Sequence, residues 1–223
     1  MSVDILRFGV QLTMFEIDPA YCEWLRKYFE ASAFKLLQGD VVKTWSQEWS
    51  RNPPQRIFGN LPYNAASPII ASFIGTRHIA PLSVFSVQDE LGQRMMARPG
   101  GKDYSSFSIM CQAAVQIEDC GSLSPFSFYP VPKVKSRIVS IRPGTACGTI
   151  DNPEQFSIIL RSMFTSRRKT LSNNIAASSR IKGYPVAEKM REAFASEGID
   201  IQRRPETVAP CEWVSVANRV ADC

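Results

Sequence analysis

The first two thirds of the chain alternate between short apolar runs and segments with helical spacing, and this alternation constrains the fold most strongly. The strand-like runs cover residues 10–17, 34–38, 56–60, 82–88 and 135–143. The helix-like segments cover 19–32, 67–75, 89–97 and 105–117, the last running into a further strand. Strands that alternate with helices over short connections predict a parallel sheet with helices on both faces. Ligands of such sheets bind beyond the carboxyl ends of the strands, so the residues at those ends are the candidates for a site.

The character of the sequence changes between residues 143 and 154, where a loop-like stretch precedes a tail without strands. Segments 154–175, 186–198 and 211–221 carry apolar residues at i, i+3 and i+4, the spacing of amphipathic helices. We therefore predict an α/β domain over residues 1–145 and a small helical domain over residues 146–223. No apolar run approaches the roughly 20 residues that span a bilayer, and no signal peptide is evident. We expect a cytoplasmic protein without membrane contact.

Basic side chains are concentrated in two segments that lack any acidic residue. The chain of 223 residues has a formal net charge of +5, which alone is weak evidence for a polyanionic partner. The acid-free segments are 121–150, with Lys133, Lys135, Arg137 and Arg142, and 155–187, with Arg161, Arg167, Arg168, Lys169, Arg180 and Lys182. An ordinary solvated face would interleave Glu and Asp with these cations. The distribution favours a surface for nucleic-acid phosphates.

Cysteine and histidine usage argues against metal chemistry. The six cysteines are scattered without a Cys-x-x-Cys pair, and His78 is the only histidine. Zinc sites need closely spaced ligands, so we expect no metal and interpret the cysteines as reduced, buried thiols.

Acidic residues end the first two strand-like runs. Glu16 and Asp18 end the first, and Asp40 follows Gly39 at the end of the second. A carboxylate at such a strand end can accept hydrogen bonds from ribose hydroxyls, as Glu16 would, whereas Asp18 is better placed to cap the next helix. Asp40 could accept a hydrogen bond from an adenine amino group, or it could be a simple turn residue.

The third run ends in Asn60-Leu61-Pro62-Tyr63, followed by a helix-like segment with Ser67 as its expected cap and Pro68 in its first turn. The exocyclic nitrogen of adenine is a poor nucleophile because its lone pair is delocalised into the ring. Two fixed acceptors that bind both N–H groups would draw this nitrogen towards tetrahedral geometry, and the lone pair would then point at a methyl donor. The Asn60 side-chain oxygen and the Leu61 carbonyl are suitable acceptors.

Pro62 and Tyr63 in this loop are also suited to a reaction on an adenine amino group. Pro62 biases Leu61 towards an extended conformation and stiffens the loop. Tyr63 can stack on the base, as enzymes that flip a base out of its helix require. The alternative interpretation is a strand-to-helix turn in which Asn is a turn former and Pro begins the helix.

Several segments resemble the ribosomal RNA adenine dimethyltransferases of the KsgA/RsmA type, a Rossmann-like family with a small C-terminal helical domain. The resembling segments are LTMFEIDPAY, LLQGDVVK, FGNLPYNAASPII, FSVQDELGQRM, FYPVPKVKSRIVSIRP, MFTSRRKTLSNNI and RRPETVAPCEWVSVAN. The resemblance implies S-adenosyl-L-methionine as cofactor, N6,N6-dimethylation of two adjacent adenosines near the 3′ end of 16S rRNA, and a monomer that acts on the pre-30S subunit.

The resemblance also implies residue roles. It assigns cofactor contacts to Glu16, Ile17, Asp40, Val41 and Asn60. It assigns catalysis and base stacking to Asn60, Leu61, Pro62, Tyr63 and Phe128. It assigns rRNA contacts to Lys133, Arg167, Arg168 and Lys169.

One family feature is missing from this sequence. The family begins with a strand and a glycine-rich loop that approaches the cofactor, and no such loop is present here. We expect that Met1 is an internal methionine and that the protein starts upstream; a genuinely shortened protein is the alternative. Without that first strand, the strands that carry Glu16 and Asn60 lose a neighbour, which predicts unpaired backbone and exposed apolar surface.

Three other functions remain open at this stage. A large-subunit rRNA dimethylase of the macrolide-resistance type would use the same chemistry. A ribosome-assembly factor that binds RNA but is impaired in catalysis would keep the basic segments. A DNA adenine methylase is less consistent, because such enzymes usually carry a second proline where Leu61 stands.

Overall fold

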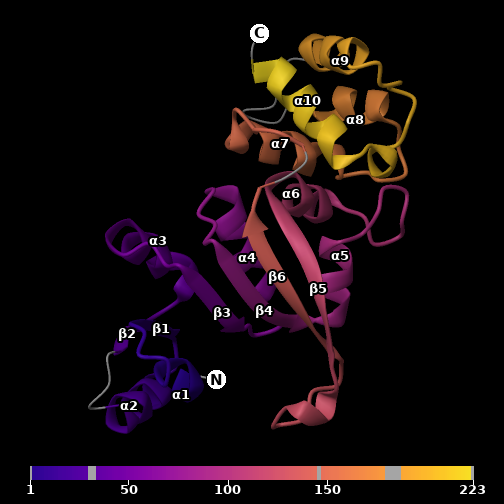
Figure 1. Ribbon diagram of the computed structural model, residues 1–223. Coiled ribbons are helices and arrows are strands. Elements are labelled where there is room, and N and C mark those ends of the chain that lie inside the picture. Colours follow the sequence, from indigo (N-terminus) through magenta and orange to yellow (C-terminus); the bar gives the residue numbers. More distant parts are fainter. Residues whose placement is uncertain (1, 30–33, 145–146, 179–186, 222–223) are drawn as a thin grey trace. The chain divides into compact units, whose positions relative to one another are not determined.

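A computed structural model describes residues 2–29, 34–144, 147–178 and 187–221 (Figure 1). The chain divides into two compact units, residues 1–54 and residues 55–223. The boundary predicted between residues 145 and 146 falls outside the described residues and stays a prediction. Arg180, Lys182 and Cys223 also lie outside them.

The described residues of the first unit form two parallel strands and three helices. Its elements are α1 (Ser2–Leu6), β1 (Leu12–Glu16), α2 (Pro19–Tyr28), β2 (Phe34–Gln38) and α3 (Val41–Arg51). Strands β1 and β2 pair in register, so that Glu16 lies opposite Gln38. Cys22, Phe29 and Trp45 are buried between these elements. Both strands therefore end at the same edge of a small sheet.

The second unit contains a four-stranded sheet with the order β3–β4–β6–β5. Its strands are β3 (Arg56–Asn60), β4 (Leu82–Gln88), β5 (Val115–Leu123) and β6 (Ser136–Pro143). The intervening helices are α4 (Ala66–Gly75), α5 (Asp89–Met95) and α6 (Ser106–Ala114). Strands β3 and β4 are parallel, whereas β6 runs antiparallel to both β4 and β5.

The sheet differs from the entirely parallel sheet that the alternating pattern predicted. Segment 115–143 forms a hairpin of β5 and β6, and a hairpin imposes antiparallel pairing. In addition, β1 and β2 form a separate sheet, because within the described residues β1 pairs only with β2 and β3 only with β4. Phe58 on β3 is 43% exposed. This agrees with the expected free edge and exposed apolar surface at these strands.

The C-terminal part of the second unit is helical, as predicted. It comprises α7 (Pro153–Met163), α8 (Leu171–Ser178), α9 (Ala187–Ser196), the 3-10 helix η2 (Pro205–Thr207) and α10 (Pro210–Ala221). Segment 154–175 forms two helices, α7 and α8, with residues 164–170 between them. The core of this part includes Trp213 and Phe194, whose rings meet edge to face at 5.7 Å, and it extends to Ile109 in α6 and to Tyr104, which precedes α6.

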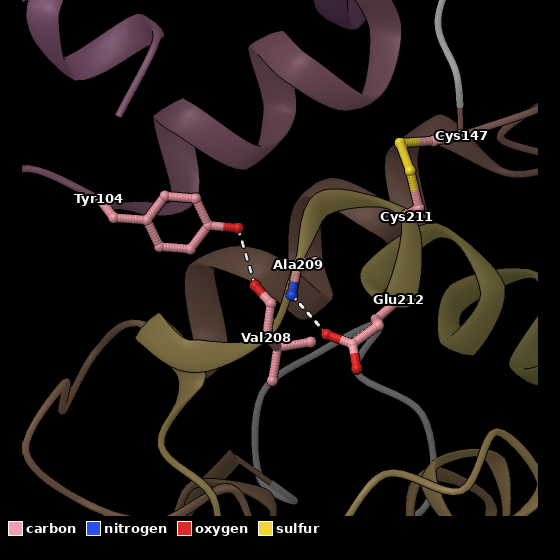
Figure 2. The surroundings of a disulfide bond; sticks show 6 residues. All are labelled: Tyr104, Cys147, Val208, Ala209, Cys211 and Glu212. Carbon is pink, nitrogen blue, oxygen red and sulfur yellow. Dashed lines mark hydrogen bonds between the residues drawn. A yellow bond between two sulfur atoms is a disulfide. The ribbon is translucent and has the colours of Figure 1, made fainter. Parts of the chain in front are cut away.

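A disulfide joins Cys147 to Cys211 at the start of α10 (Figure 2). The expectation of free thiols is therefore wrong for these two residues. Their separation of 64 residues hides the pairing in the sequence, since it depends on how the linker before α7 packs against α10. Cys22 and Cys111 are free and buried as expected, and burial raises the pKa of the Cys111 thiol far above its usual value. Cys120 is free but exposed.

The start of α10 is also fixed by polar contacts. The Tyr104 hydroxyl donates to the Val208 carbonyl at 2.8 Å, and the Ala209 N–H donates to the Glu212 carboxylate at 2.6 Å (Figure 2). Burial raises the pKa of Tyr104, and the nearby Glu212 charge adds to this effect. Burial alone would raise the pKa of Glu212, but hydrogen bonds from Arg203 and Ala209 outweigh it and the pKa lies below its usual value.

Candidate methyltransferase and RNA site

Glu16 occupies the carboxyl end of β1. One of its carboxylate oxygens, Oε1, accepts hydrogen bonds from the N–H groups of Ile17 at 2.7 Å and Asp18 at 2.9 Å. These bonds fix the carboxylate against its own backbone, and no hydrogen bond to Oε2 is found within the described residues. Glu16 therefore presents an oriented acceptor at the strand end. Ile17, which follows, is 66% exposed.

Asp18 and Asp40 cap the two following helices. The Asp18 side chain accepts from Ala20 N–H at 2.7 Å and Tyr21 N–H at 3.3 Å, as predicted. Asp40 caps α3 by accepting from Val42 N–H at 2.9 Å through its Oδ1 oxygen. Val41 is the first residue of α3. Oδ1 therefore has a helix-capping role that the sequence analysis did not assign, while Oδ2 accepts from no described donor.

The first unit places these two carboxylates at one edge. The Gly39 N–H donates to the Glu16 carbonyl at 2.8 Å, which ties the residue before Asp40 to the end of β1. Two fixed carboxylates that each keep an oxygen for a ligand fit the hydroxyl and amino groups of an adenosyl moiety. The two carboxylate acceptors at this edge are consistent with the adenosyl part of S-adenosyl-L-methionine.

The Asn60-Leu61-Pro62-Tyr63 loop begins at the carboxyl end of β3 in the second unit. Leu61 N–H donates to the Ser86 carbonyl on β4 at 3.1 Å, and the Pro62 carbonyl accepts from the N–H groups of Ala65 and Ala66, both at 2.9 Å. The loop backbone is thus held at both ends. Within the described residues, the Asn60 carboxamide and the Leu61 carbonyl form no hydrogen bond.

This pattern bears on the two interpretations of the loop. An Asn in a turn commonly accepts from the backbone N–H two residues further on, but here that residue is Pro62, which has no N–H. The exposed Asn60 side chain makes no hydrogen bond within the described residues. Two oxygen acceptors on consecutive residues are therefore left for a ligand, on a backbone that the neighbouring strand fixes.

Helix α4 starts one residue earlier than expected. The Pro62 carbonyl receives the first helical N–H groups, so Ala65 is the N-cap residue, with no hydrogen bond from its side chain. The prediction of Ser67 as the cap is wrong for this reason. Pro68 lies in the first turn, where its missing N–H costs nothing.

Tyr63 connects the loop to β6. Its hydroxyl lies 2.8 Å from the Ser136 hydroxyl, and the Asp89 N–H donates to the Lys135 carbonyl at 3.0 Å. Next along β6, Arg137 donates to Asp89 at 2.7 Å and pairs with Asp119 on β5. These contacts fix the loop end of the β5–β6 hairpin beside residues 60–63. The sequence analysis missed Ser136 and this ion-pair role of Arg137, although a charged residue in a half-buried strand was a usable signal.

Gly59 leaves space for the side chains of Leu61, two residues further on, and Phe85 on β4. A Cβ atom at position 59 would lie 2.8 Å from Leu61 Cδ2 and 3.0 Å from the buried Phe85 Cδ1. A Gly59→Ala variant must therefore displace Leu61 or Phe85. We expect methyl transfer to fall by about 10²-fold, because a misplacement of about 1 Å at a site has an effect of this size.

A matched control uses Gly75, where an added Cβ meets nothing within 4 Å. Single-turnover methylation and thermal melting of both alanine variants would check the expectation. Equal activities for Gly59→Ala and Gly75→Ala would contradict the proposed packing constraint.

The remaining predicted RNA contacts lie on the β5–β6 hairpin and beside α8. Phe128, at the end of the 3-10 helix η1 (Pro125–Ser127), is half-buried, and Lys133 is exposed. Arg168 and Lys169 are also exposed. Arg167 differs from them, because it donates to Glu206 at 3.2 Å and to the Lys102 carbonyl at 3.1 Å. Its guanidinium is thus already used to join α7–α8 to η2.

The described part of the chain offers no cluster of three or more His, Cys, Asp or Glu side chains that could hold a metal ion. Nor does it contain a helix with the length and apolar character needed to cross a membrane.

An α/β sheet whose strand ends in an Asn-Leu-Pro-Tyr loop with two free acceptors defines the class of methyltransferases that act on adenine amino groups. The chain belongs to the ribosomal RNA adenine dimethylase family, whose model matches residues 2–222. It is 33% identical over 222 residues to ribosomal RNA small subunit methyltransferase A of Treponema denticola, covering 98% of this chain and 75% of that protein. It is 35% identical over 219 residues to the protein of the same name from Borreliella burgdorferi, covering 98% and 74%.

Solved structures support the same fold. A dimethyladenosine transferase from Plasmodium falciparum superimposes with a TM-score of 0.75 at 20% identity, covering 96% of this chain and 83% of that one. The 23S rRNA methyltransferase ErmE superimposes with a TM-score of 0.60, also at 20% identity, covering 95% and 82%. The Rossmann-like fold predicted from the sequence is confirmed.

Proposed function

We propose that this protein transfers methyl groups from S-adenosyl-L-methionine to the N6 atoms of two adjacent adenosines near the 3′ end of 16S rRNA. The observation that carries the proposal is the pair of free acceptors on Asn60 and Leu61, held by the hydrogen bond between Leu61 N–H and the Ser86 carbonyl. The identities with small-subunit methyltransferases support the small subunit as substrate over the large one.

The two acceptors would bind the two N–H groups of the target amine. Each accepted hydrogen bond draws electron density towards the nitrogen and favours its tetrahedral form. An acceptor fixed in advance costs no reorganisation when the reaction occurs, which is the main source of electrostatic catalysis. No strong general base is required, since the proton can leave after the methyl group has been transferred.

Aromatic rings would hold the base while the amine reacts. Tyr63 is positioned by its contact with Ser136, and Phe128 is half-buried on the adjoining hairpin. Rings of this kind stack on an extruded base and offset the cost of unstacking it from its neighbours. We infer that Tyr63 and Phe128 enclose the target adenine.

The cofactor would supply the electrophilic methyl group. Glu16, with Ile17, would accept hydrogen bonds from ribose hydroxyls, and Asp40, with Val41, would bind the adenine ring. We infer that Asn60 also contacts the cofactor. The oriented Glu16 carboxylate and the free Asp40 oxygen are the observations that support these assignments. We further propose that the protein acts as a cytoplasmic monomer on the pre-30S subunit.

Primer extension on treated ribosomal RNA tests the proposal, because an N6,N6-dimethyladenosine blocks reverse transcription. Unmodified small and large subunits should be incubated separately with protein and cofactor. Two adjacent stops near the 3′ end of 16S rRNA are the expected result. Stops in 23S rRNA alone would favour the large-subunit alternative, and binding without any stop would favour an assembly factor.

The basic residues beside α8 should not contribute equally to rRNA binding. Arg168→Gln with Lys169→Gln should lower the slope of log affinity against log salt by about 1.4, since each lost contact to single-stranded RNA removes about 0.7. Arg167→Gln should change that slope less and should lower the melting temperature, because it breaks the bonds to Glu206 and Lys102. Filter binding at several salt concentrations would measure the slopes. A slope change for Arg167→Gln of half that of the double variant or more would contradict this division.

A further inference from the structure

The loop between β5 and β6, residues 124–135, exposes an unusual amount of aromatic and aliphatic surface. Phe126 is 87% exposed and Tyr129 is 100% exposed, and Val131 and Val134 are 54% and 43% exposed. Isolated apolar side chains on a surface are ordinary, but four of them on a loop of twelve residues are not. The loop and its hairpin project beyond the sheet of the second unit (Figure 1). The roles assigned above involve only two residues of this loop, Phe128 as a catalytic residue and Lys133 as an rRNA contact.

The loop backbone is ordered by local contacts. The Ser124 hydroxyl accepts from Phe126 N–H at 3.4 Å, its carbonyl accepts from Ser127 N–H at 3.0 Å, and the Pro125 carbonyl accepts from Phe128 N–H at 3.2 Å. Prolines at positions 125, 130 and 132 restrict the backbone further. The rings are therefore presented outwards by a stiff segment that does not fold them back onto the sheet.

The charge of the loop indicates the class of partner. Lys133 and Lys135 are exposed, and neither forms an ion pair with a described residue. The neighbouring Arg137, by contrast, is neutralised by Asp89 and Asp119. The loop itself contains no acidic residue. Exposed aromatic rings interleaved with unpaired cations form the usual surface for single-stranded nucleic acid, because bases stack on the rings and phosphates contact the cations.

The position of the loop links it to the catalytic site. Its C-terminal end is tied to the catalytic loop, because Ser136 contacts Tyr63 and the Lys135 carbonyl accepts from Asp89 N–H. Nucleotides next to a base held at Asn60 and Tyr63 would therefore lie near this hairpin.

We propose that the β5–β6 loop is a stacking platform for unpaired nucleotides that flank the methylated adenosines. Phe126 and Tyr129 stack on flanking bases, and Lys133 and Lys135 contact their phosphates. This inference rests on the proposed function for the identity of the RNA, and it assigns to Phe126 and Tyr129 a role distinct from that of Phe128.

The test measures binding of a fluorescein-labelled oligouridylate of about 12 nucleotides by fluorescence anisotropy. This probe is single-stranded and lacks adenine, so its binding does not depend on methyl transfer at Asn60. The variants are Phe126→Leu with Tyr129→Leu, which keeps apolar surface but removes the rings, and Tyr129→Phe, which keeps the ring. Tyr21→Leu is the matched control, because Tyr21 is 64% exposed and lies on α2, outside the loop. Thermal melting confirms that each variant folds.

The double leucine variant should bind roughly a hundredfold more weakly, because each aromatic stack contributes about tenfold to single-strand affinity. Tyr129→Phe and Tyr21→Leu should bind within about twofold of the unmodified protein. Unchanged binding by the double leucine variant would overturn the proposal. Unchanged binding of oligouridylate together with weakened binding of whole small subunits would also overturn it, in favour of a protein partner.

The proposed function is tested separately by primer extension. A ring-dependent affinity for oligouridylate without any stops in 16S rRNA would leave the stacking platform in place and remove the assigned reaction. Stops in 16S rRNA without a ring-dependent affinity would support the assigned reaction and overturn the stacking platform.

Discussion

Asn60→Ala should lower the rate of methyl transfer by about 10²–10³-fold, the usual effect of removing one preorganised hydrogen-bonding group from a reacting centre. Affinity for small subunits should stay within about twofold, because Asn60 is one exposed side chain and rRNA binding depends on many phosphate contacts. Single-turnover methylation under saturating cofactor measures the first quantity, and filter binding measures the second. The expected signature is thus a loss of rate without a loss of binding.

Asn64→Ala is the matched control for this experiment. Asn64 is also exposed and lies in the turn that leads into α4, but it is not at the strand end. Its replacement should leave both rate and affinity nearly unchanged. A loss of affinity that parallels the loss of rate in Asn60→Ala would show that Asn60 supports the loop structure and is not an acceptor for the substrate.

The oxidised protein should lose about 4 kcal/mol of unfolding free energy when Cys147 and Cys211 are both changed to serine. The two cysteines are 64 residues apart, and closing a loop of that length in the unfolded chain gives a stabilisation of about this size. The disulfide holds the linker before α7 to the start of α10 (Figure 2). Urea unfolding of the purified, air-oxidised protein would measure the difference, since thiols stay reduced in a reducing compartment.

Two controls isolate the disulfide in that measurement. Cys120→Ser removes an exposed free thiol and should leave the unfolding free energy unchanged. Excess reducing agent should make the unmodified protein and the double serine variant equally stable. A difference that persists under reduction would assign the effect to local packing of the side chains and not to the cross-link.

Some elements could be predicted from the sequence because local signals specify them. Strands β2, β3 and β4 begin and end where predicted, since each is a short apolar run with turn residues or a helix cap at its end. Asp18 was correctly interpreted as a helix cap, because capping depends on the next three residues only. The Asn60 loop was recognised for a similar reason: its four residues are contiguous.

Other features depend on contacts between distant residues and leave no local signal. Tyr63 and Ser136 are 73 residues apart, and Cys147 and Cys211 are 64 apart. The antiparallel pairing of β6 follows from the hairpin and not from the composition of the strand. Helix α3 was missed: Asp40 was interpreted as a ligand contact or a simple turn residue, and its role as the cap of that helix was not considered. The structural use of Arg167 requires Glu206, which lies far along the chain.

A crystal structure with adenosine bound tests the central claim most directly. If the amine is held by the strand-end acceptors, the adenine N6 atom should lie about 3 Å from both Asn60 Oδ1 and the Leu61 carbonyl oxygen, within the range of N–H···O hydrogen bonds. The Asn60 carboxamide turned away from N6, or an amine that contacts only water, would contradict the account.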